Sequence, residues 1–236
     1  MTPVTRIPVR ERLIHALDLP TAAQALARVD RLGDAVAFYK VGMELMAAGA
    51  LHEVIDALAQ RGKRIFVDLK FLDIPATVAA AVQELSRRPV SLCTVHAQHP
   101  QMLRAAVAAK GALRLLGVTV LTSIDDAELR DEGIAASTRD LVLARARMAA
   151  QCGIDGVVAS GHEARAIRAA LGPGVLIVCP GVRPAGDAAG DQKRTVDVAA
   201  AFAHGADYIV VGRPIAQAPD PRAAAEAIQS QVAAAM

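Results

Sequence analysis

Short apolar runs alternate with longer, alanine-rich amphipathic stretches along the whole chain. Most of the runs are apolar at nearly every position, which is typical of strands that are buried on both faces of a parallel sheet. The pattern predicts strands at Leu13–Leu17, Val36–Val41, Arg64–Leu69, Val90–His96, Leu113–Leu121, Gly156–Ala159, Val175–Cys179 and Asp207–Val211.

The stretches between these runs predict helices, and several of them carry a start signal. Thr21 can cap the first helix, Pro75 precedes the third, and Asp220 followed by Pro221 fits the cap and the first position of the last helix. The predicted helices are Thr21–Leu32, Met43–Arg61, Ala76–Arg87, Gln101–Lys110, Thr138–Cys152, His162–Leu171, Val196–His204 and Pro221–Ala234.

Each predicted strand is followed by a helix, and eight such units in 236 residues match the size of a TIM (β/α)8 barrel. An open, doubly wound sheet is the alternative. That fold usually has a glycine-rich turn after its first strand, whereas here the first run continues into Asp18-Leu19-Pro20. We therefore expect an α/β protein in which residues 1–236 form a single barrel domain.

Composition narrows the choice of partners and of compartment. The formal net charge is +2 and aromatic residues make up 3% of the chain, so nucleic-acid binding is not expected. The N-terminus has no apolar signal region, and no run reaches the roughly 18 apolar residues that a membrane span needs. Three cysteines without metal-ligand spacing indicate a reducing compartment, so we expect a cytoplasmic protein.

One charged segment stands out at the end of the third predicted strand. Asp68-Leu69-Lys70-Phe71-Leu72-Asp73 places two carboxylates and one ammonium within six residues. Asp68 and Lys70 are two positions apart, so on a strand they project from the same face. Charges beside a buried strand are costly unless they pair or do chemistry. Taken alone, the segment fits a structural ion pair as well as it fits a catalytic site.

Polar residues also follow the other predicted strands, at the barrel end where active sites lie. The starts of the strands carry little recognisable chemistry, and this asymmetry favours an enzyme over a purely structural barrel. For His96 we expect a hydrogen-bonded histidine behind the site or in the core, and Ser160 lacks the surroundings of a nucleophile. The polar residues at the strand ends are Asp18, Lys40, Asp68, Lys70, His96, Thr122, Ser123, Ser160, Arg183 and Arg213.

The seventh and eighth units predict a phosphate site, because barrels often bind phosphate with the loops that follow these strands. Pro180-Gly181 and Gly212-Arg213 stand at these places. Glycine lets the backbone approach closely and offer N–H donors, and arginine supplies a bidentate cation. The connection from Arg183 to Arg194 is long for such a loop, which is typical of lids, and its Gln192 can close over a phosphate ester.

With these residues in view, the chain resembles the orotidine 5′-monophosphate decarboxylase family along nearly its whole length. The segment from Asp68 to Asp73, continued by Ile74-Pro75-Ala76-Thr77, is highly specific for this family and its close relatives. The other matching segments are Ala16-Leu17-Asp18, Tyr39-Lys40-Val41-Gly42, Thr94-Val95-His96-Ala97, Val118-Thr119-Val120-Leu121-Thr122-Ser123, Pro180-Gly181-Val182-Arg183, Gly190-Asp191-Gln192 and Val211-Gly212-Arg213-Pro214-Ile215.

The resemblance implies that CO₂ is removed from C6 of the pyrimidine of orotidine 5′-monophosphate, giving UMP, without a metal or any other cofactor. It implies that Lys70 stabilises the carbanion at C6 and then protonates it, while Asp68 lies near the substrate carboxylate. Two like charges about 4 Å apart repel by roughly 4 kcal/mol at an effective dielectric constant of 20. That repulsion disappears when CO₂ leaves, and the attraction between Asp68 and Lys70 remains.

The resemblance also implies how the substrate is held. Asp18 and Lys40 hold the ribose hydroxyls and complete the charged network, and Thr122 contacts the pyrimidine edge. The residues implied for the phosphate side of the substrate are Pro180, Arg183, Gln192, Gly212 and Arg213. In this family, the residues at the positions of Asp73 and Thr77 reach into the partner subunit's active site. We therefore expect an obligate homodimer with shared sites.

Two other functions stay open at this point. Related phosphosugar decarboxylases and synthases share the DxKxxD segment but use Mg²⁺, with a carboxylate at the end of the second strand. Here that position is Lys40, a cation that would repel the metal, and Glu44 lies on the following helix. A non-catalytic barrel that binds phosphate esters would keep Arg213 but would not need Lys70 between two carboxylates.

Overall fold

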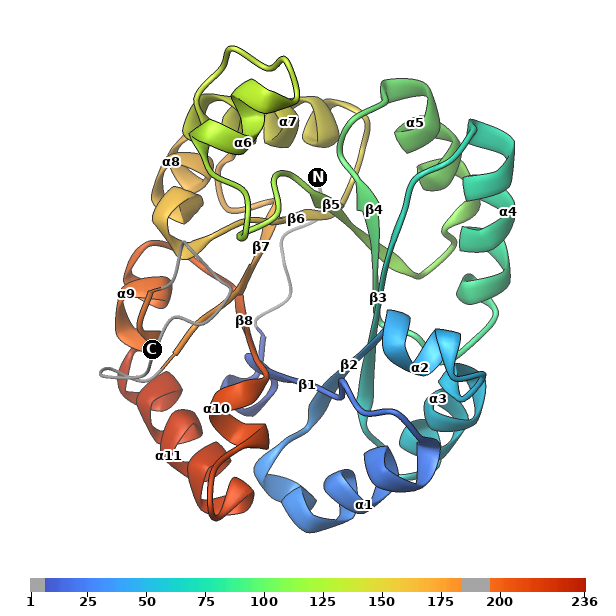
Figure 1. The fold of residues 1–236 in the computed structure, drawn as a ribbon, viewed down its shortest axis with the longest axis vertical. Coiled ribbons are helices and arrows are strands. Elements are labelled where there is room, and N and C mark those ends of the chain that lie inside the picture. The colour runs from blue at the N-terminus through green and yellow to red at the C-terminus, as the bar shows by residue number, and fades with distance from the viewer. Residues whose placement is uncertain (1–6, 184–195) are drawn as a thin grey trace.

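The strands close into a barrel. The computed structural model describes residues 7–183 and 196–236. Each strand pairs in parallel with the next in sequence order, and β8 closes against β1 (Figure 1). The strands are β1 Leu13–Ala16, β2 Phe38–Gly42, β3 Arg64–Phe71, β4 Leu92–His96, β5 Arg114–Val118, β6 Gly156–Val158, β7 Leu176–Pro180 and β8 Tyr208–Val211. The prediction of a (β/α)8 barrel is confirmed.

Helices form a ring around these strands (Figure 1). The predicted caps are present: the Thr21 hydroxyl accepts a hydrogen bond from the Gln24 N–H, and Asp220 caps the last helix. The helices are α1 Ala22–Leu32, α2 Met43–Ala47, α3 Leu51–Gln60, α4 Pro75–Ser86, α5 Pro100–Ala109, α6 Asp126–Asp131, α7 Thr138–Gln151, α8 Gly161–Leu171, α9 Val198–Ala203, α10 Arg213–Ala216 and α11 Pro221–Ala234, with short 3₁₀ helices η1 Val9–Glu11 and η2 Gly33–Ala35.

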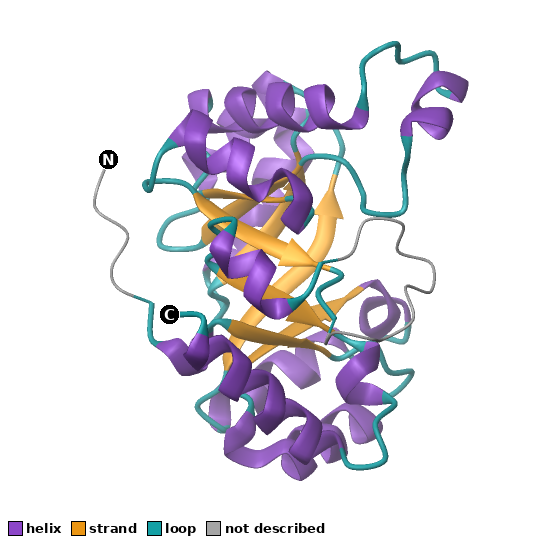
Figure 2. Cartoon of the chain, turned by 90° about the vertical axis from the view of Figure 1, so that its left-hand side faces the viewer, coloured by secondary structure: helices purple, strands orange, loops and turns teal. Residues whose placement is uncertain are grey.

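Some predicted boundaries are wrong. The helix predicted over Met43–Arg61 is two helices, α2 and α3, because Gly49 adopts a left-handed backbone with φ of 71° and ends the first of them. The strand predicted to reach Leu121 ends at Val118. Helices α6 and α10 were not predicted, since each is shorter than two turns and carries little periodicity. In Figure 2, α6 stands away from the ring of helices.

Two apolar cores hold the barrel together. One lies between the strands and the outer helices, and the other fills the barrel interior. Ile7, just before η1, belongs to the inner core and is 7% exposed. The inner core comprises Ile7, Ile14, Ala16, Phe38, Phe66, Leu92, Leu116, Leu176, Val178, Tyr208 and Val210. Because the interior is filled with side chains, a ligand site has to lie at one end of the barrel.

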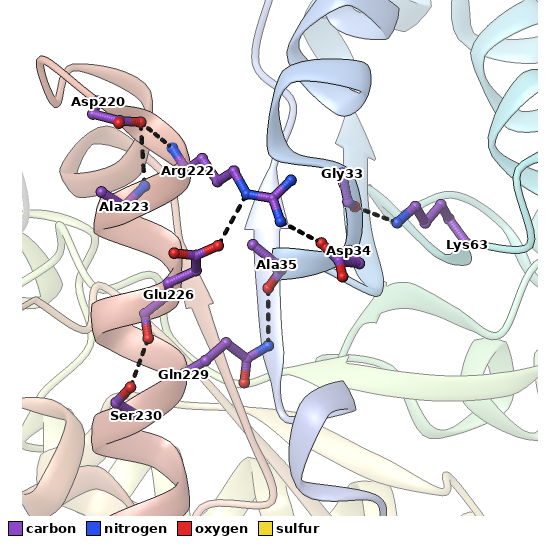
Figure 3. Close-up of polar contacts among 10 residues, drawn as sticks. All are labelled: Gly33, Asp34, Ala35, Lys63, Asp220, Arg222, Ala223, Glu226, Gln229 and Ser230. Atoms are coloured by element: carbon purple, nitrogen blue, oxygen red, sulfur yellow. Dashed lines mark hydrogen bonds and ion pairs between the residues drawn. The ribbon is translucent and has the colours of Figure 1, made fainter.

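A polar seam joins α11, near the C-terminus, to the turn between α1 and β2 that contains η2 (Figure 3). Arg222 donates to Asp34 at 2.6 Å and to Glu226 on its own helix at 2.9 Å. Gly33 leaves room for this guanidinium, since a Cβ atom there would lie 2.7 Å from Nη1 of Arg222.

Within the described residues, no helix is long and apolar enough to cross a membrane.

Candidate active site

A cavity of about 580 Å³ opens at the carboxyl ends of the strands. This volume lies in the range of small-molecule sites. Apolar side chains of the barrel, such as Phe66, Val158 and Val210, form part of its lining. The predicted site residues that line it are Asp18, Lys40, Asp68, Lys70, Thr122, Pro180, Arg183, Gly212 and Arg213. These nine residues come from six separate segments of the sequence and are brought to one space.

Four charged side chains form a connected network in this lining. Lys70 Nζ lies 2.9 Å from Oδ2 of Asp68, and Lys40 Nζ lies 3.5 Å from the same oxygen. Lys40 also reaches Oδ1 of Asp18 at 3.2 Å. The side chains of Lys40 and Asp68 are each 13% exposed, whereas that of Asp18 is 57% exposed. Two ammonium groups therefore share one buried carboxylate, and the second carboxylate, that of Asp18, is the exposed member of the network.

The network keeps its members charged. Burial by itself would raise the pKa of the Asp68 carboxyl, but Lys40, Lys70 and a hydrogen bond from Thr94 hold that pKa below its ordinary value. Burial by itself would lower the pKa of Lys40, but Asp68 and Asp18 raise it above its ordinary value. Both groups are therefore ionised at neutral pH.

Lys70 lies on an irregular part of β3. Its φ is 51°, and no other non-glycine residue of the described ranges has a positive φ. A backbone of this kind costs on the order of 1–3 kcal/mol and is found most often at functional sites. The register of β3 and β4 shifts here, so that three residues of β3 lie opposite Thr94 alone. Asp68 and Lys70 meet as expected, although the strand between them is not regular.

The predicted phosphate-binding residues lie at the ends of two neighbouring strands. Pro180 ends β7 and pairs in register with Val210 of β8, which places the two following loops side by side. Gly212 precedes α10 and Arg213 is its first residue. These residues and Arg183 line the same cavity as Lys70. Gln192 lies outside the described residues, as do the other residues of 184–195.

Asp73 and Thr77 do not line the cavity of their own chain. Asp73 is exposed in the turn between β3 and α4, where its Oδ1 accepts a hydrogen bond from the Ile74 N–H at 2.6 Å. Thr77 is exposed in the first turn of α4. Both residues point to solvent at the rim of the barrel, next to the exposed apolar side chains of Leu72 and Ile74.

Three other polar residues at strand ends have different surroundings. Thr122 lines the cavity from the loop after β5, beyond the strand end at Val118. Nδ1 of His96 is buried and has no hydrogen-bond partner among the described residues, so the hydrogen bond we expected for this histidine is not found at that atom. Burial, together with Lys70 and Arg145, lowers the pKa of His96. The Ser160 hydroxyl caps α8, which is a structural role.

Sequence reasoning missed Thr94. This residue of β4 is fully buried, and its hydroxyl contacts both Asp68 and the Lys70 backbone. The available signal is one hydroxyl in the otherwise apolar run Leu92-Cys93-Thr94-Val95, beside the charged segment on the neighbouring strand.

In residues 7–183 and 196–236, no group of three or more His, Cys, Asp or Glu side chains could hold a metal ion.

Comparison with known proteins gives consistent matches. The model of the orotidine 5′-phosphate decarboxylase / HUMPS family matches residues 11–228. The orotidine 5′-phosphate decarboxylase of Stenotrophomonas maltophilia is 59% identical over 233 residues, which cover 98% of this chain and 97% of that protein. That of Xanthomonas campestris pv. campestris is 57% identical over 235 residues, covering 99% and 97%. The crystal structure of the Lactobacillus acidophilus enzyme of the same name superposes with a TM-score of 0.84 at 38% identity, covering 94% of this chain and 99% of that one.

Proposed function

The chain belongs to the orotidine 5′-phosphate decarboxylase / HUMPS family, and from this premise we propose that it converts orotidine 5′-monophosphate to UMP in pyrimidine biosynthesis. The observation that carries the proposal is the contact of two lysines with one buried carboxylate at the side of the cavity. The substrate brings a carboxylate and a phosphate. Cationic side chains line the cavity both at this network and in the loops after β7 and β8.

The chemical step places an electron pair on carbon. The bond between C6 and the carboxylate breaks, CO₂ leaves, and the pair stays on C6. The Lys70 ammonium stabilises this charge and gives one proton to C6, and its amine then takes a proton from water. Asp68 lies beside the substrate carboxylate, where it repels that group, and remains as the partner of Lys70 once CO₂ has left.

Binding of the rest of the nucleotide supports this step from a distance. In our proposal, Asp18 and Lys40 hold the ribose hydroxyls and Thr122 contacts the pyrimidine. The 5′-phosphate is bound from the loops after β7 and β8. Interactions with parts of the substrate that do not react can orient the reacting group, so they add to the rate as well as to affinity. The proposed phosphate-side residues are Pro180, Arg183, Gln192, Gly212 and Arg213.

The position of Lys40 argues against the Mg²⁺-dependent alternative. Its ammonium lies between Asp18 and Asp68, at 3.2 Å and 3.5 Å from their oxygens. A divalent cation bound by these two carboxylates would have to displace Lys40, which stays protonated because its pKa is raised. We therefore propose a reaction that needs neither a metal nor another cofactor.

We also propose that the enzyme is a homodimer with shared sites. Asp73 and Thr77 lie at the rim and outside their own cavity, which fits side chains that complete a neighbouring site. Two exposed apolar side chains flank Asp73 in the turn after β3, with exposed fractions of 48% for Leu72 and 65% for Ile74, and α2 exposes Met43 and Met46 as well. Exposed apolar side chains next to Asp73 fit a surface that a second subunit covers.

The reaction is tested by following the ultraviolet absorbance of orotidine 5′-monophosphate with purified protein, with and without EDTA. Conversion to UMP that EDTA does not affect is expected. Loss of conversion with EDTA would support the metal-using relatives. Absence of conversion by folded protein that still binds UMP would support the non-catalytic barrel.

The shared site is tested by mixing two inactive variants. Lys70→Ala and Asp73→Asn should each be inactive alone. After subunit exchange, half of the dimers should be mixed, and one of the two sites in each mixed dimer carries both native residues. Activity should therefore return to about a quarter of the wild-type value per site, if the subunits assort at random. No recovery after exchange verified by mass spectrometry would contradict the shared site.

Two coarser proposals complete this picture. The three cysteines, Cys93, Cys152 and Cys179, are all free and buried, which supports a reducing compartment such as the cytoplasm. We also keep residues 1–236 as one barrel domain. A single cooperative unfolding transition in urea would support that assignment.

A further inference from the structure

Thr94 lies behind the charged network, on the strand next to the one that carries Asp68 and Lys70. The residue is fully buried. Its hydroxyl accepts a hydrogen bond from the Lys70 backbone N–H at 2.9 Å and donates one to Oδ1 of Asp68 at 2.9 Å. One side chain thus contacts both a backbone atom of the lysine and the carboxylate that the lysine pairs with.

The direction of both hydrogen bonds is fixed by chemistry. A backbone N–H can only donate, and an ionised carboxylate can only accept. The Thr94 hydroxyl must therefore use a lone pair toward Lys70 and its proton toward Asp68. Since Asp68 is held ionised, this arrangement has no competing orientation of the hydroxyl.

The two contacts orient the two halves of the catalytic pair. The Asp68 carboxylate has its Oδ1 held by Thr94, which leaves Oδ2 facing Lys70 at 2.9 Å and Lys40 at 3.5 Å. The Lys70 backbone has the left-handed conformation described above, at the place where β3 and β4 lose their regular pairing. The hydroxyl supplies the acceptor that the Lys70 N–H would otherwise lack there.

We propose that Thr94 is a positioning residue for the decarboxylation, which holds the Asp68 carboxylate and the Lys70 backbone in the geometry that aims the ammonium at C6. The inference rests on the proposed function. Thr94 does not line the cavity, so it acts through Asp68 and Lys70 and not through contact with the substrate.

A matched control lies on the neighbouring strand end. Thr119 is also fully buried, and its hydroxyl donates to the carbonyl of Val158 at 2.9 Å. Among the described residues, this carbonyl is the only hydrogen-bond partner of its hydroxyl, while the Thr119 carbonyl accepts a hydrogen bond from Arg145 at 2.7 Å, a backbone contact that a Thr119→Val substitution retains. Comparing Thr94→Val with Thr119→Val therefore separates the loss of a buried hydroxyl from the loss of its contact with the network.

The test measures turnover of orotidine 5′-monophosphate and binding of UMP in the full-length wild type, Thr94→Val, Thr94→Ser and Thr119→Val. Thr94→Val should lower kcat by about 10-fold to 100-fold, since misplacing a reacting group by about 1 Å can cost 100-fold. KM and the Kd for UMP should change by less than about threefold. Thr94→Ser keeps the hydroxyl, so its kcat should stay within about threefold of wild type. Thr119→Val removes a hydroxyl that does not contact the network, and its kcat should also stay within about threefold of wild type.

A pH profile adds a readout that packing alone would not move. The titratable groups near Asp68 are Lys40, Lys70, Cys93 and His96, and all variants retain them. Removing the Thr94 hydroxyl takes away one hydrogen bond that favours the ionised carboxylate. The acid limb of kcat/KM should therefore move to higher pH in Thr94→Val and stay in place in Thr94→Ser.

Three outcomes would overturn the inference. The first is a wild-type kcat in folded Thr94→Val. The second is a kcat in Thr94→Ser as low as that in Thr94→Val, since this would assign the effect to packing of the methyl group. The third is an equal loss in Thr119→Val. If Thr94→Val does not fold, Thr94→Ala is judged against Thr94→Ser by the same criteria. A wild-type protein without turnover would instead refute the proposed function.

Discussion

The barrel has a charged cluster at each of its ends, and the two clusters differ in how their charges are matched. The carboxyl-end cluster contains Asp18, Lys40, Asp68 and Lys70. The amino-end cluster is built on Arg64, the first residue of β3. Arg64 Nη1 lies 2.5 Å from Oε2 of Glu11 and 3.4 Å from the Tyr208 hydroxyl, and its guanidinium carbon lies 4.5 Å from the centre of the Phe38 ring.

The comparison teaches that the sharing of a carboxylate beside a cavity, and not the number of charges, separates the two clusters, because cations and carboxylates are equal in number in each. Arg64 and Glu11 are 29% and 25% exposed, close to the 28% of Lys70, whereas Lys40 and Asp68 are each 13% exposed. At the amino end, Arg64 pairs with one carboxylate and stacks on an aromatic ring. At the carboxyl end, Lys40 lies between Asp18 and Asp68, and Lys70 shares the Asp68 carboxylate with it beside the cavity. The first arrangement is a self-contained pair, whereas the second places a lysine with one shared carboxylate next to the space that a ligand would fill.

The largest effect should come from removing the Lys70 ammonium from the carboxyl-end cluster. Lys70→Ala should reduce turnover of orotidine 5′-monophosphate by at least about 1000-fold, because it removes both the proton donor and the charge that stabilises the carbanion. Asp68 keeps Lys40 as a partner, so the protein should remain folded and bind UMP. Steady-state kinetics and calorimetric titration with UMP measure the two quantities, and normal turnover by this variant would refute the assignment of Lys70.

The sequence predicts most of the fold because the barrel is encoded by repeated apolar runs. Each predicted strand lies within three residues of the observed one at either end, since strands buried on both faces leave a clear signal. The failures have local causes. The break between α2 and α3 depends on the backbone of one glycine, and α6 begins at a capping box, Asp125 with Glu128, that marks a start but not a length.

Only those site residues that stand at the ends of predicted strands could be predicted from the sequence pattern. Asp18, Lys40, Asp68 and Lys70 meet because β1, β2 and β3 pair side by side and end at the same edge of the barrel. The role of Thr94 depends on a bulge in β3, and no periodicity in the sequence reveals such a bulge. The amino-end cluster also went unpredicted. Its partners are distant in sequence, with Glu11, Arg64 and Tyr208 meeting only in the closed barrel.

An acid titration should sharpen the comparison by isolating a titratable group that lies between the two clusters. The group that titrates is His15, in the β1 wall between the two ends. Its Nδ1 donates to the Val211 carbonyl at 2.9 Å, and burial lowers its pKa from 6.5 to about 4. Between these two pKa values, His15 is protonated in the unfolded chain but not in the folded chain. Its contribution to the free energy of unfolding is therefore fully present above about pH 6.5 and is lost as the pH falls toward 4.

The contribution of His15 to the free energy of unfolding should fall by about 3 kcal/mol between about pH 8 and pH 4. Urea unfolding of the wild type and of His15→Gln at several pH values measures it, and the variant should show a shallower dependence by that amount. His96, whose pKa is also lowered, adds a loss of the same sign in both proteins. Equal slopes for the two proteins would show that His15 is not the acid-sensitive group.

The smallest of the three effects should arise at the amino end, and it should be on stability alone. Arg64→Leu removes the charge partner of Glu11 and the hydrogen bond to Tyr208. We expect a loss of about 2 kcal/mol in urea unfolding, below the value for a fully buried pair because both side chains are partly exposed. Since Arg64 lies at the far end of the strand from Asp68, kcat should not change. Arg64→Leu combined with Glu11→Gln should lose less than the sum of the single variants, because the double variant leaves no unpaired carboxylate. A reduced kcat in Arg64→Leu at full folding would break the comparison, since it would mean that the amino-end cluster also sets the geometry of the catalytic strand.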